Sequence, residues 1–224
     1  MRIAGSYGAL AVSSGAGSAH NVSHAVTGVL GRGVASSHIS EHDVRVVVAH
    51  DRRDQAGWSV QVARLHRQLR ADFGTVSLGY AAPRAGTGAG KRALAEAVEA
   101  LHIGDRVFGT GHLTSYGDAR LAAFLLGHVG VVELRSLYEH AVGKLLFDDL
   151  NSGSDLVATL EAYCHSGASV HDTAERLGVH RNTVLNRMRR IRSLTQTSVD
   201  DGSSRLLLQV GLLAGRIVGQ PQLA

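Results

Sequence analysis

The stretch that decides the fold of the C-terminal part runs from Ser169 to Leu194 and reads SVHDTAERLGVHRNTVLNRMRRIRSL. Ser169 and Asp172 have the spacing of a capping box, which fixes the start of a helix. Gly178 follows, and glycine suits the left-handed backbone that ends a helix in a tight turn. A second helix is expected from about His180. The stretch therefore predicts two helices joined by a short turn.

The spacing of three residues indicates how these two helices cross. Ala174 is small enough to let them approach closely, Gly178 makes the turn, and Val184 packs the second helix over the first. This arrangement is typical of a helix-turn-helix, in which the second helix enters the major groove of DNA.

The excess positive charge of the chain is concentrated in residues 169–192. Residues 169–192 hold six arginines and two acidic residues, and this excess of four equals the formal net charge of the whole 224-residue chain, +4. No acidic residue occurs between His180 and Leu194. Such asymmetry is expected of an element that faces nucleic acid.

Helical geometry predicts which side chains face DNA. If Val184 and Ile191 mark the buried direction, a rotation of about 100° per residue places Asn182, Asn186 and Arg189 on the opposite side. Asn can pair with adenine and Arg with guanine, while Thr and Arg also bind phosphates, so the division between base and phosphate contacts stays open. The predicted DNA-binding residues are Arg181, Asn182, Thr183, Asn186, Arg187, Arg189 and Arg190.

The first half of the chain alternates between strand and helix patterns, which favours a sheet covered by helices. Strands are expected at Ile3–Val12, Val34–His38, Val44–Ala49, Gly74–Tyr80 and Arg106–Phe108, with a loop at Pro83–Gly90. Helices are expected at Asn21–Leu30, Trp58–Phe73, Lys91–His102 and Asp118–Gly127.

From Val131 onward the pattern is helical, so the chain as a whole is predicted to be α+β. Helices are expected at Val131–Phe147, Asp155–His165, Ser169–Leu177, His180–Leu194 and Ser203–Val218, with a polar break and linker at Asp148–Gly153. We expect an α/β regulatory or dimerisation domain over residues 1–128, a connecting helix and linker over 129–153, and a helix-turn-helix domain over 154–224.

Composition excludes several classes of protein. No apolar run approaches the roughly 20 residues that a membrane-spanning helix needs, so no membrane partner is expected. The single cysteine, Cys164, forms no intrachain disulfide and fits a reducing cytoplasm. Although the chain has 13 histidines, none shows the spacing of a Cys/His metal site, so neither a metal nor a cofactor is predicted.

Four segments resemble the C-terminal domain of PucR/CdaR-type transcriptional regulators. They are LVATLEAY (156–163), TAERLGVHRNTV (173–184), RMRRI (187–191) and RLLLQ (205–209), of which VHRNT is the most specific. The region is also similar to the Fis-type helix-turn-helix. The sequence departs from the family at Asn186, where a larger aromatic or basic residue is common. The resemblance implies a transcriptional regulator that binds double-stranded DNA.

The resemblance extends upstream. Val44–Gly127, with Ser77–Tyr80, Ala93–Leu101 and Leu113–Tyr116 in order, looks like the GGDEF-like middle domain of these regulators. Family members usually carry a further N-terminal sensory domain that this sequence is expected to lack, which suggests a shortened regulator or a fragment.

An enzyme is the first alternative, because GGDEF domains include nucleotide cyclases. The corresponding turn here, Ser40–Asp43, lacks the paired glycines that let the backbone approach a phosphate, so no enzymatic activity is predicted. A second alternative is a catalytically dead ligand- or nucleotide-sensing module that controls DNA binding, with an unidentified small-molecule effector. Gly86–Arg92 lacks the spacing of a phosphate-binding loop and is interpreted as a flexible loop.

A homodimer is expected, because one recognition helix reads few base pairs and two copies can reach half-sites about 34 Å apart. The apolar stripes of Val131–Phe147 and Leu206–Ile217 could supply its interface or belong to the core of one chain. The sequence leaves both interpretations open.

Overall fold

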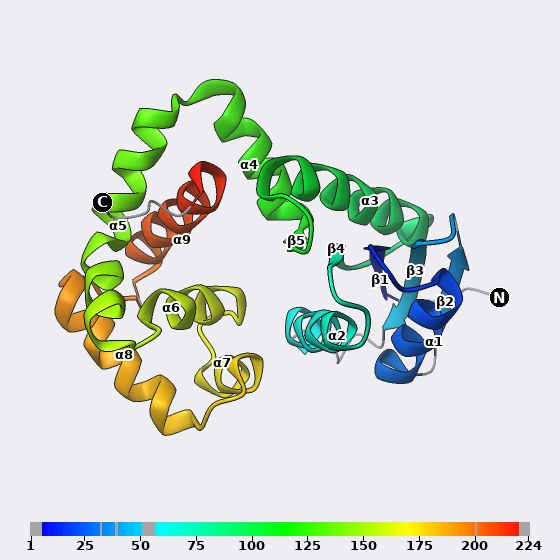
Figure 1. The fold of residues 1–224 in the computed structure, drawn as a ribbon, viewed down its shortest axis with the longest axis horizontal. Helices are drawn as coiled ribbons and strands as arrows, with labels where there is room; N and C mark the ends of the chain where they lie inside the picture. Colours follow the sequence, from blue (N-terminus) through cyan, green and yellow to red (C-terminus); the bar gives the residue numbers. More distant parts are fainter. Residues whose placement is uncertain (1–5, 32, 39, 51–56, 200, 220–224) are drawn as a thin grey trace. The chain divides into compact units, whose positions relative to one another are not determined.

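The chain folds into two compact units, Met1–Ala123 and Phe124–Ala224 (Figure 1). The computed structural model describes residues 6–31, 33–38, 40–50, 57–199 and 201–219. The N-terminal unit contains a five-stranded sheet with helices, and the C-terminal unit is helical in its described part. The predicted α+β class is therefore confirmed.

The sheet of the N-terminal unit has the strand order β2-β3-β1-β4-β5. Its neighbours are antiparallel except for β4 and β5, which are parallel. The strands are β1 (Ser6–Ser14), β2 (Val34–His38), β3 (Asp43–His50), β4 (Val76–Ala85) and β5 (Leu113–Ser115). The helices are α1 (Ala19–Leu30), α2 (Trp58–Phe73), α3 (Ala89–Phe108) and α4 (Tyr116–His128), the last of which continues into the second unit.

Successive side chains of β1 point to opposite faces of the sheet, and the two faces differ in composition. Leu10 and Val12 lie on the face covered by α1 and α2, where they join a core that includes Val22 and Leu65 (Figure 1). The first four strands and two helices follow the order β-α-β-β-α-β, with β1 inserted between β3 and β4, which is the split βαβ arrangement. Trp58 anchors α2, because its indole N–H donates to the Ala81 carbonyl at 3.0 Å.

The opposite face is lined by alanines and is covered by α3. Ala9 and Ala11 of β1 are buried against Ala93 and Ala97 of the helix. Gly79 of β4 is required there, because a Cβ atom at this position would lie 2.3 Å from the Ala97 carbonyl oxygen. Small residues on both sides therefore bring α3 close to β1 and β4.

In the C-terminal unit, two helices pack along each other and three shorter ones form the predicted helix-turn-helix region. Gly211 and Gly215 allow the close contact of the last helix with Ala141 and Tyr138. The helices are α5 (Val131–Ser152), α6 (Leu156–His165), α7 (Val170–Leu177), α8 (Arg181–Thr195) and α9 (Gly202–Val218). The apolar stripe of α5 that includes Leu134, Tyr138 and Leu145 is buried, so it belongs to the core of one chain.

The structure corrects three predictions of local structure. Residues 106–108 end helix α3 instead of forming a strand, because the helix continues to Gly109, which takes a positive φ of 82°. Residues 83–85 belong to β4 and α3 begins at Ala89, which leaves only 86–88 of the predicted loop. The polar run 148–152 is the last part of α5, so the predicted break is reduced to the turn around Gly153.

The short strand β5, Leu113–Ser115, was not predicted from the sequence, whereas the other elements overlap their predicted ranges. The antiparallel hairpin of β2 and β3 and helix α2 are confirmed. The start of the first predicted strand, residues 3–5, lies outside the described residues, and β1 covers the remainder.

Buried His66 predicts a pH dependence of the N-terminal unit. Its Nε2–H donates to the Val76 carbonyl at 2.8 Å, and burial lowers the pKa of its imidazole below the ordinary 6.5. Because the unfolded chain takes up this proton first, the contribution of His66 to stability is present above pH 6.5 and is lost as the pH falls below it. When the pH is lowered from about 7.5 to about 5.5, the melting temperature of His66→Gln should fall by less than that of the wild type.

The control is His24→Gln, since His24 is an exposed histidine on α1 of the same unit. That variant should keep the pH dependence of the wild type. Equal pH dependence of the wild type and His66→Gln would contradict the assignment.

Candidate nucleic-acid interface

Helix α7 begins and ends as predicted from the sequence. The Ser169 hydroxyl accepts a hydrogen bond from the Asp172 backbone N–H at 3.2 Å, which caps the first turn. Gly178 has φ 69° and ψ 32°, a left-handed conformation, and its N–H bonds to carbonyls of the last turn. His180 then caps α8, because its Nδ1 accepts from the Asn182 backbone N–H at 3.2 Å.

The two helices cross as the spacing predicts. Val184 and Ile191 of α8 are fully buried, and Ala174 of α7 is 7% exposed. Met188 and Leu194 are half-buried along the same side of α8. Burial of one side fixes the rotation of α8 about its own axis, so that the other side is directed to solvent.

The outward side of α8 carries Asn182, Asn186 and Arg189, and we call these three residues the outer face of α8. All three are exposed. The Arg189 Nη1–H donates to the Asn186 amide oxygen at 2.7 Å, which links two of the three side chains. Arg181, at the first position of the helix, is also exposed. The structure therefore brings these four predicted residues to one end and one side of α8.

Arg187 lies in a different environment from the outer face. Its Nη2 pairs with the Asp155 carboxylate at 2.8 Å, and its Nη1–H donates to the Thr159 hydroxyl at 3.2 Å. Only 19% of its side chain is exposed. Thr183, on the same flank of α8, is half-buried. These contacts direct Arg187 toward α6, so it holds α8 in place within the unit.

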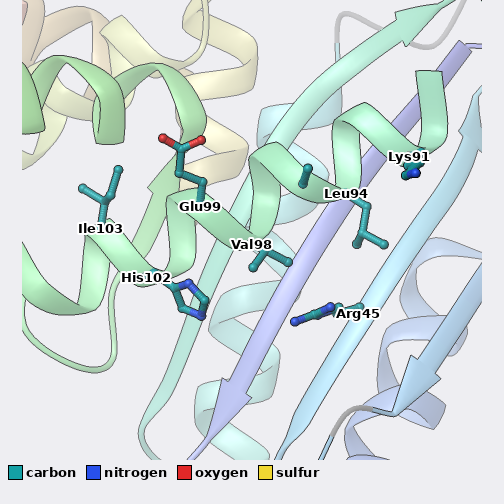
Figure 2. A pocket seen from close by; sticks show the side chains of 8 residues that line it. Arg45, Lys91, Leu94, Val98, Glu99, His102 and Ile103 are labelled. Carbon is teal, nitrogen blue, oxygen red and sulfur yellow. The ribbon is translucent and has the colours of Figure 1, made fainter. Parts of the chain in front are cut away.

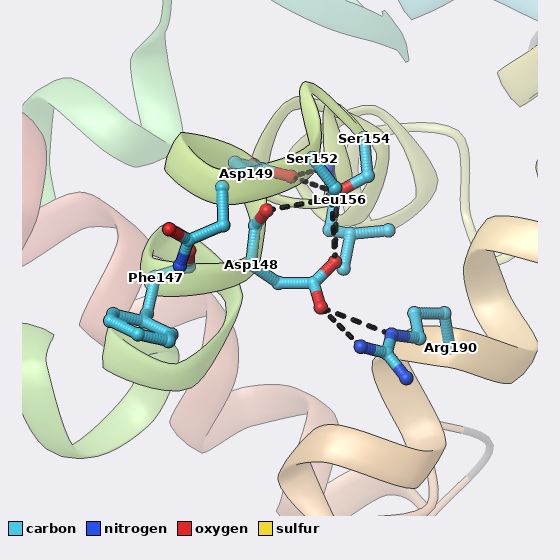
Figure 3. Close-up of polar contacts among 8 residues, drawn as sticks. Phe147, Asp148, Asp149, Ser152, Ser154, Leu156 and Arg190 are labelled. Atoms are coloured by element: carbon cyan, nitrogen blue, oxygen red, sulfur yellow. Dashed lines mark hydrogen bonds and ion pairs between the residues drawn. The ribbon is translucent and has the colours of Figure 1, made fainter.

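Arg190 is bound to the end of α5. Its Nε and Nη2 donate to one carboxylate oxygen of Asp148 at 3.1 and 2.5 Å (Figure 3). These hydrogen bonds hold the pKa of Asp148 below its ordinary value. The Arg190 side chain remains 55% exposed, so it can still meet a partner from solvent.

The neighbouring carboxylate, Asp149, caps helix α6. It accepts from the backbone N–H of Leu156 at 2.6 Å (Figure 3) and from that of Val157 at 2.9 Å. The Ser154 hydroxyl bridges Asp148 and Asp149 at 2.9 and 2.8 Å. Asp155, at the usual capping position, has φ 54° and makes no side-chain cap, because its carboxylate binds Arg187 instead.

Sequence reasoning missed these supporting residues. Asp148 lies 42 residues before Arg190, and Asp155 lies 32 residues before Arg187. A local sequence pattern cannot predict ion pairs across such distances in the chain. The polar run that contains Asp148 and Asp149 was interpreted as a linker because of its composition. In the folded chain it joins α5 to both α6 and α8.

The described residues show neither a metal-ligand cluster nor an accessible reactive thiol. Among the described residues, no three His, Cys, Asp or Glu side chains are grouped as metal ligands would be. Cys164 is buried, and burial raises the pKa of its thiol to about 11. The helices within the described ranges are all too short or too polar to cross a membrane.

Residues 156–214 match the family model of the PucR C-terminal helix-turn-helix domain. This range extends from the start of α6 into α9 and includes all seven predicted DNA-binding residues. The predicted resemblance to PucR-type regulators is confirmed for this segment. The upstream resemblance to a GGDEF-like domain stays a prediction.

The chain is also similar to the purine catabolism regulatory protein of Bacillus subtilis (strain 168), with 29% identity over 126 residues. This match covers 56% of the chain but only 23% of the length of that regulator. Among solved structures, the chain is similar to the regulator of polyketide synthase expression from Bifidobacterium adolescentis. That comparison has 19% identity and a TM-score of 0.41, and it covers 95% of this chain and 81% of the other.

A substitution at Asp149 tests whether the end of α5 stabilises the helix-turn-helix region by capping α6. Replacing Asp149 with alanine leaves two N–H groups of α6 without their acceptor, so the free energy of unfolding should fall by about 1 kcal/mol, the usual cost of losing a cap. Urea unfolding measures this change. Glu139→Ala removes an exposed carboxylate from the same helix and should change stability by less than about 0.5 kcal/mol. Equal effects of the two substitutions would contradict the assigned cap.

Proposed function

We propose that this chain is a DNA-binding transcriptional regulator that reads operator DNA with the outer face of α8. The observation that carries the proposal is the orientation of α8. Its buried side is fixed by Val184 and Ile191, while Asn182, Asn186 and Arg189 face solvent. The match of residues 156–214 to the PucR helix-turn-helix domain supports the same function.

The chemistry of the outer face suits base recognition. Asn presents a donor and an acceptor to adenine, and Arg presents two donors to guanine in the major groove. The hydrogen bond between Arg189 and Asn186 limits the freedom of both side chains before DNA arrives, which favours binding to one base sequence. Arg181, exposed at the start of the helix, is placed to bind a phosphate.

The arginines on the flank have a different proposed role. Arg187 is largely buried on Asp155 and Thr159, so its contribution to DNA binding is to hold α8 at the correct angle. Arg190 uses Nε and Nη2 for Asp148, which leaves its exposed Nη1 for a DNA phosphate. Thr183 is half-buried beside them, and its hydroxyl is proposed to add a phosphate contact.

We propose that the regulator binds DNA as a homodimer, because a second copy would place another α8 in the next major groove. The apolar stripe of α5 is used within the chain, so an interface needs other side chains. Exposed apolar residues of the C-terminal unit remain available on α5 and α9: Val131, Val132, Phe147, Leu150, Leu206 and Leu207. Phe147 and Leu150 are 68% and 69% exposed and, three residues apart, lie on the same side of α5.

We propose one role for each of three consecutive segments of the chain. Residues 154–224 would bind DNA, 129–153 would connect, and 1–128 would serve regulation or dimerisation. The split βαβ order of the first unit agrees with a GGDEF-like domain, and the turn at Ser40–Asp43 has no glycine pair for a nucleotide phosphate.

The test is selection of genomic DNA fragments by the purified chain, followed by affinity measurements on the selected sequence. Asn182→Ala and Arg189→Ala should each weaken binding by about 1–3 kcal/mol if these residues read bases. Asn182→Ala should also relax the selected consensus and leave the salt dependence unchanged. Arg181→Ala should lower the salt slope and keep the consensus, because a phosphate contact releases a counterion.

The matched control is Arg135→Ala, because Arg135 is an exposed arginine on α5 of the same unit. This variant should bind like the wild type. A consensus with two-fold symmetry would support the homodimer. Unchanged operator affinity in both Asn182→Ala and Arg189→Ala would refute the proposed recognition face.

A further inference from the structure

The N-terminal unit has a surface cavity of about 470 Å³ between α3 and β3 (Figure 2). It lies on the face of the sheet that α3 covers. Because Ala93 and Ala97 seat α3 closely on β1 and β4, β3 lies beyond the edge of the helix. Arg45 of β3 therefore borders an open space beside α3. The volume falls within the range typical of small-molecule sites.

The floor of the cavity is apolar. Leu94, Val98 and Ile103 of α3 line it, and each of these side chains is half-buried. In Figure 2, Leu94 points toward Arg45, and Val98 lies between Arg45 and His102. A ligand with an apolar body would cover these three side chains and remove them from water.

The polar residues of the cavity are mostly cationic. Arg45 and Lys91 carry permanent positive charges, and His102 lies further along α3. The carboxylate of Glu99 points away from Arg45 in Figure 2 and pairs with Arg120 at 3.1 Å. Within the described residues, neither Arg45 nor Lys91 has a carboxylate at ion-pair distance. The cavity is thus positively charged and complementary to an anion.

A smaller adjoining hollow of about 140 Å³ shows how a ligand would be oriented. It shares Arg45, Val98 and His102 with the cavity and also contains Asp43 and Asp105. These two carboxylates repel an anion, so a negative group is favoured at the Lys91 end of the cavity.

We propose that this cavity binds a small organic acid. The carboxylate or phosphate of the ligand would pair with Arg45 or Lys91, and its apolar body would lie on Leu94 and Val98. A nucleoside triphosphate fits less well, because Arg45 and Lys91 do not balance its charge and no glycine is among the described residues that line the cavity. The inference goes beyond DNA binding and does not depend on it.

The experiment is isothermal titration calorimetry of the full chain, without DNA, against naphthoate, naphthyl phosphate, inorganic phosphate and ATP. The first two share an apolar body and distinguish a carboxylate from a phosphate. At least one of them should bind saturably, once per chain. Inorganic phosphate, which has no apolar body, should not bind measurably. Arg45→Gln and Lys91→Gln should each weaken binding roughly tenfold or more, since each removes a charged hydrogen-bond donor.

The control is Arg92→Gln, because Arg92 is an exposed arginine of the same helix that lies outside the cavity lining. It should bind the ligand like the wild type. Thermal melting of Arg45→Gln and Lys91→Gln checks that both variants stay folded. The proposal is overturned if neither apolar acid binds, if folded Arg45→Gln and Lys91→Gln bind as tightly as the wild type, or if ATP binds more tightly than both acids. Since DNA is absent, each outcome leaves the proposed DNA-binding function untouched.

Discussion

The burial of Val184 and Ile191 is the constraint on which the C-terminal unit depends. These two side chains are seven residues apart, so they lie on one side of α8, and neither is exposed to solvent. A rotation of α8 by even a quarter of a turn would bring arginine side chains into an apolar core at a large energetic cost. The outer face of α8 is therefore defined by the core and is independent of any ligand.

A second constraint comes from the last turn of α5. Asp149 caps α6 and Asp148 binds Arg190 of α8, so two adjacent carboxylates connect one helix to both others (Figure 3). Ser154 joins the two carboxylates to each other. Because α5 also packs along α9, the helix-turn-helix is part of one larger helical core.

The elements predicted correctly are those whose signals are local. Ser169, Gly178 and the seven-residue spacing of Val184 and Ile191 are local features of the sequence, and the structure agrees with each. The polar positions of the outer face of α8 followed from the same spacing.

The errors arose where distant contacts decide the structure. The run from Asp148 to Ser152 is polar, which resembles a linker, yet its carboxylates are satisfied by residues that follow it in the chain. Arg187 stays a predicted DNA-binding residue, but its ion pair with Asp155 and its hydrogen bond to Thr159 of α6 could not be predicted from the neighbouring sequence. Residues 106–108 favour a strand by propensity, and the helix that precedes them continues through them. None of these three features of the structure can be predicted from a short stretch of sequence.

The most direct test of the central claim is affinity cleavage of DNA from the outward side of α8. Cys164 is the only cysteine in the chain, and it is buried with a raised thiol pKa, so an iron chelate can be attached selectively to a cysteine introduced at exposed Ser193. A chelate at exposed Glu139 on α5 serves as the reference. The account predicts that Ser193→Cys cuts the selected DNA at a few positions facing the major groove of each half-site, and that the reference does not. Absence of cleavage from Ser193→Cys while the labelled protein still binds DNA would contradict it.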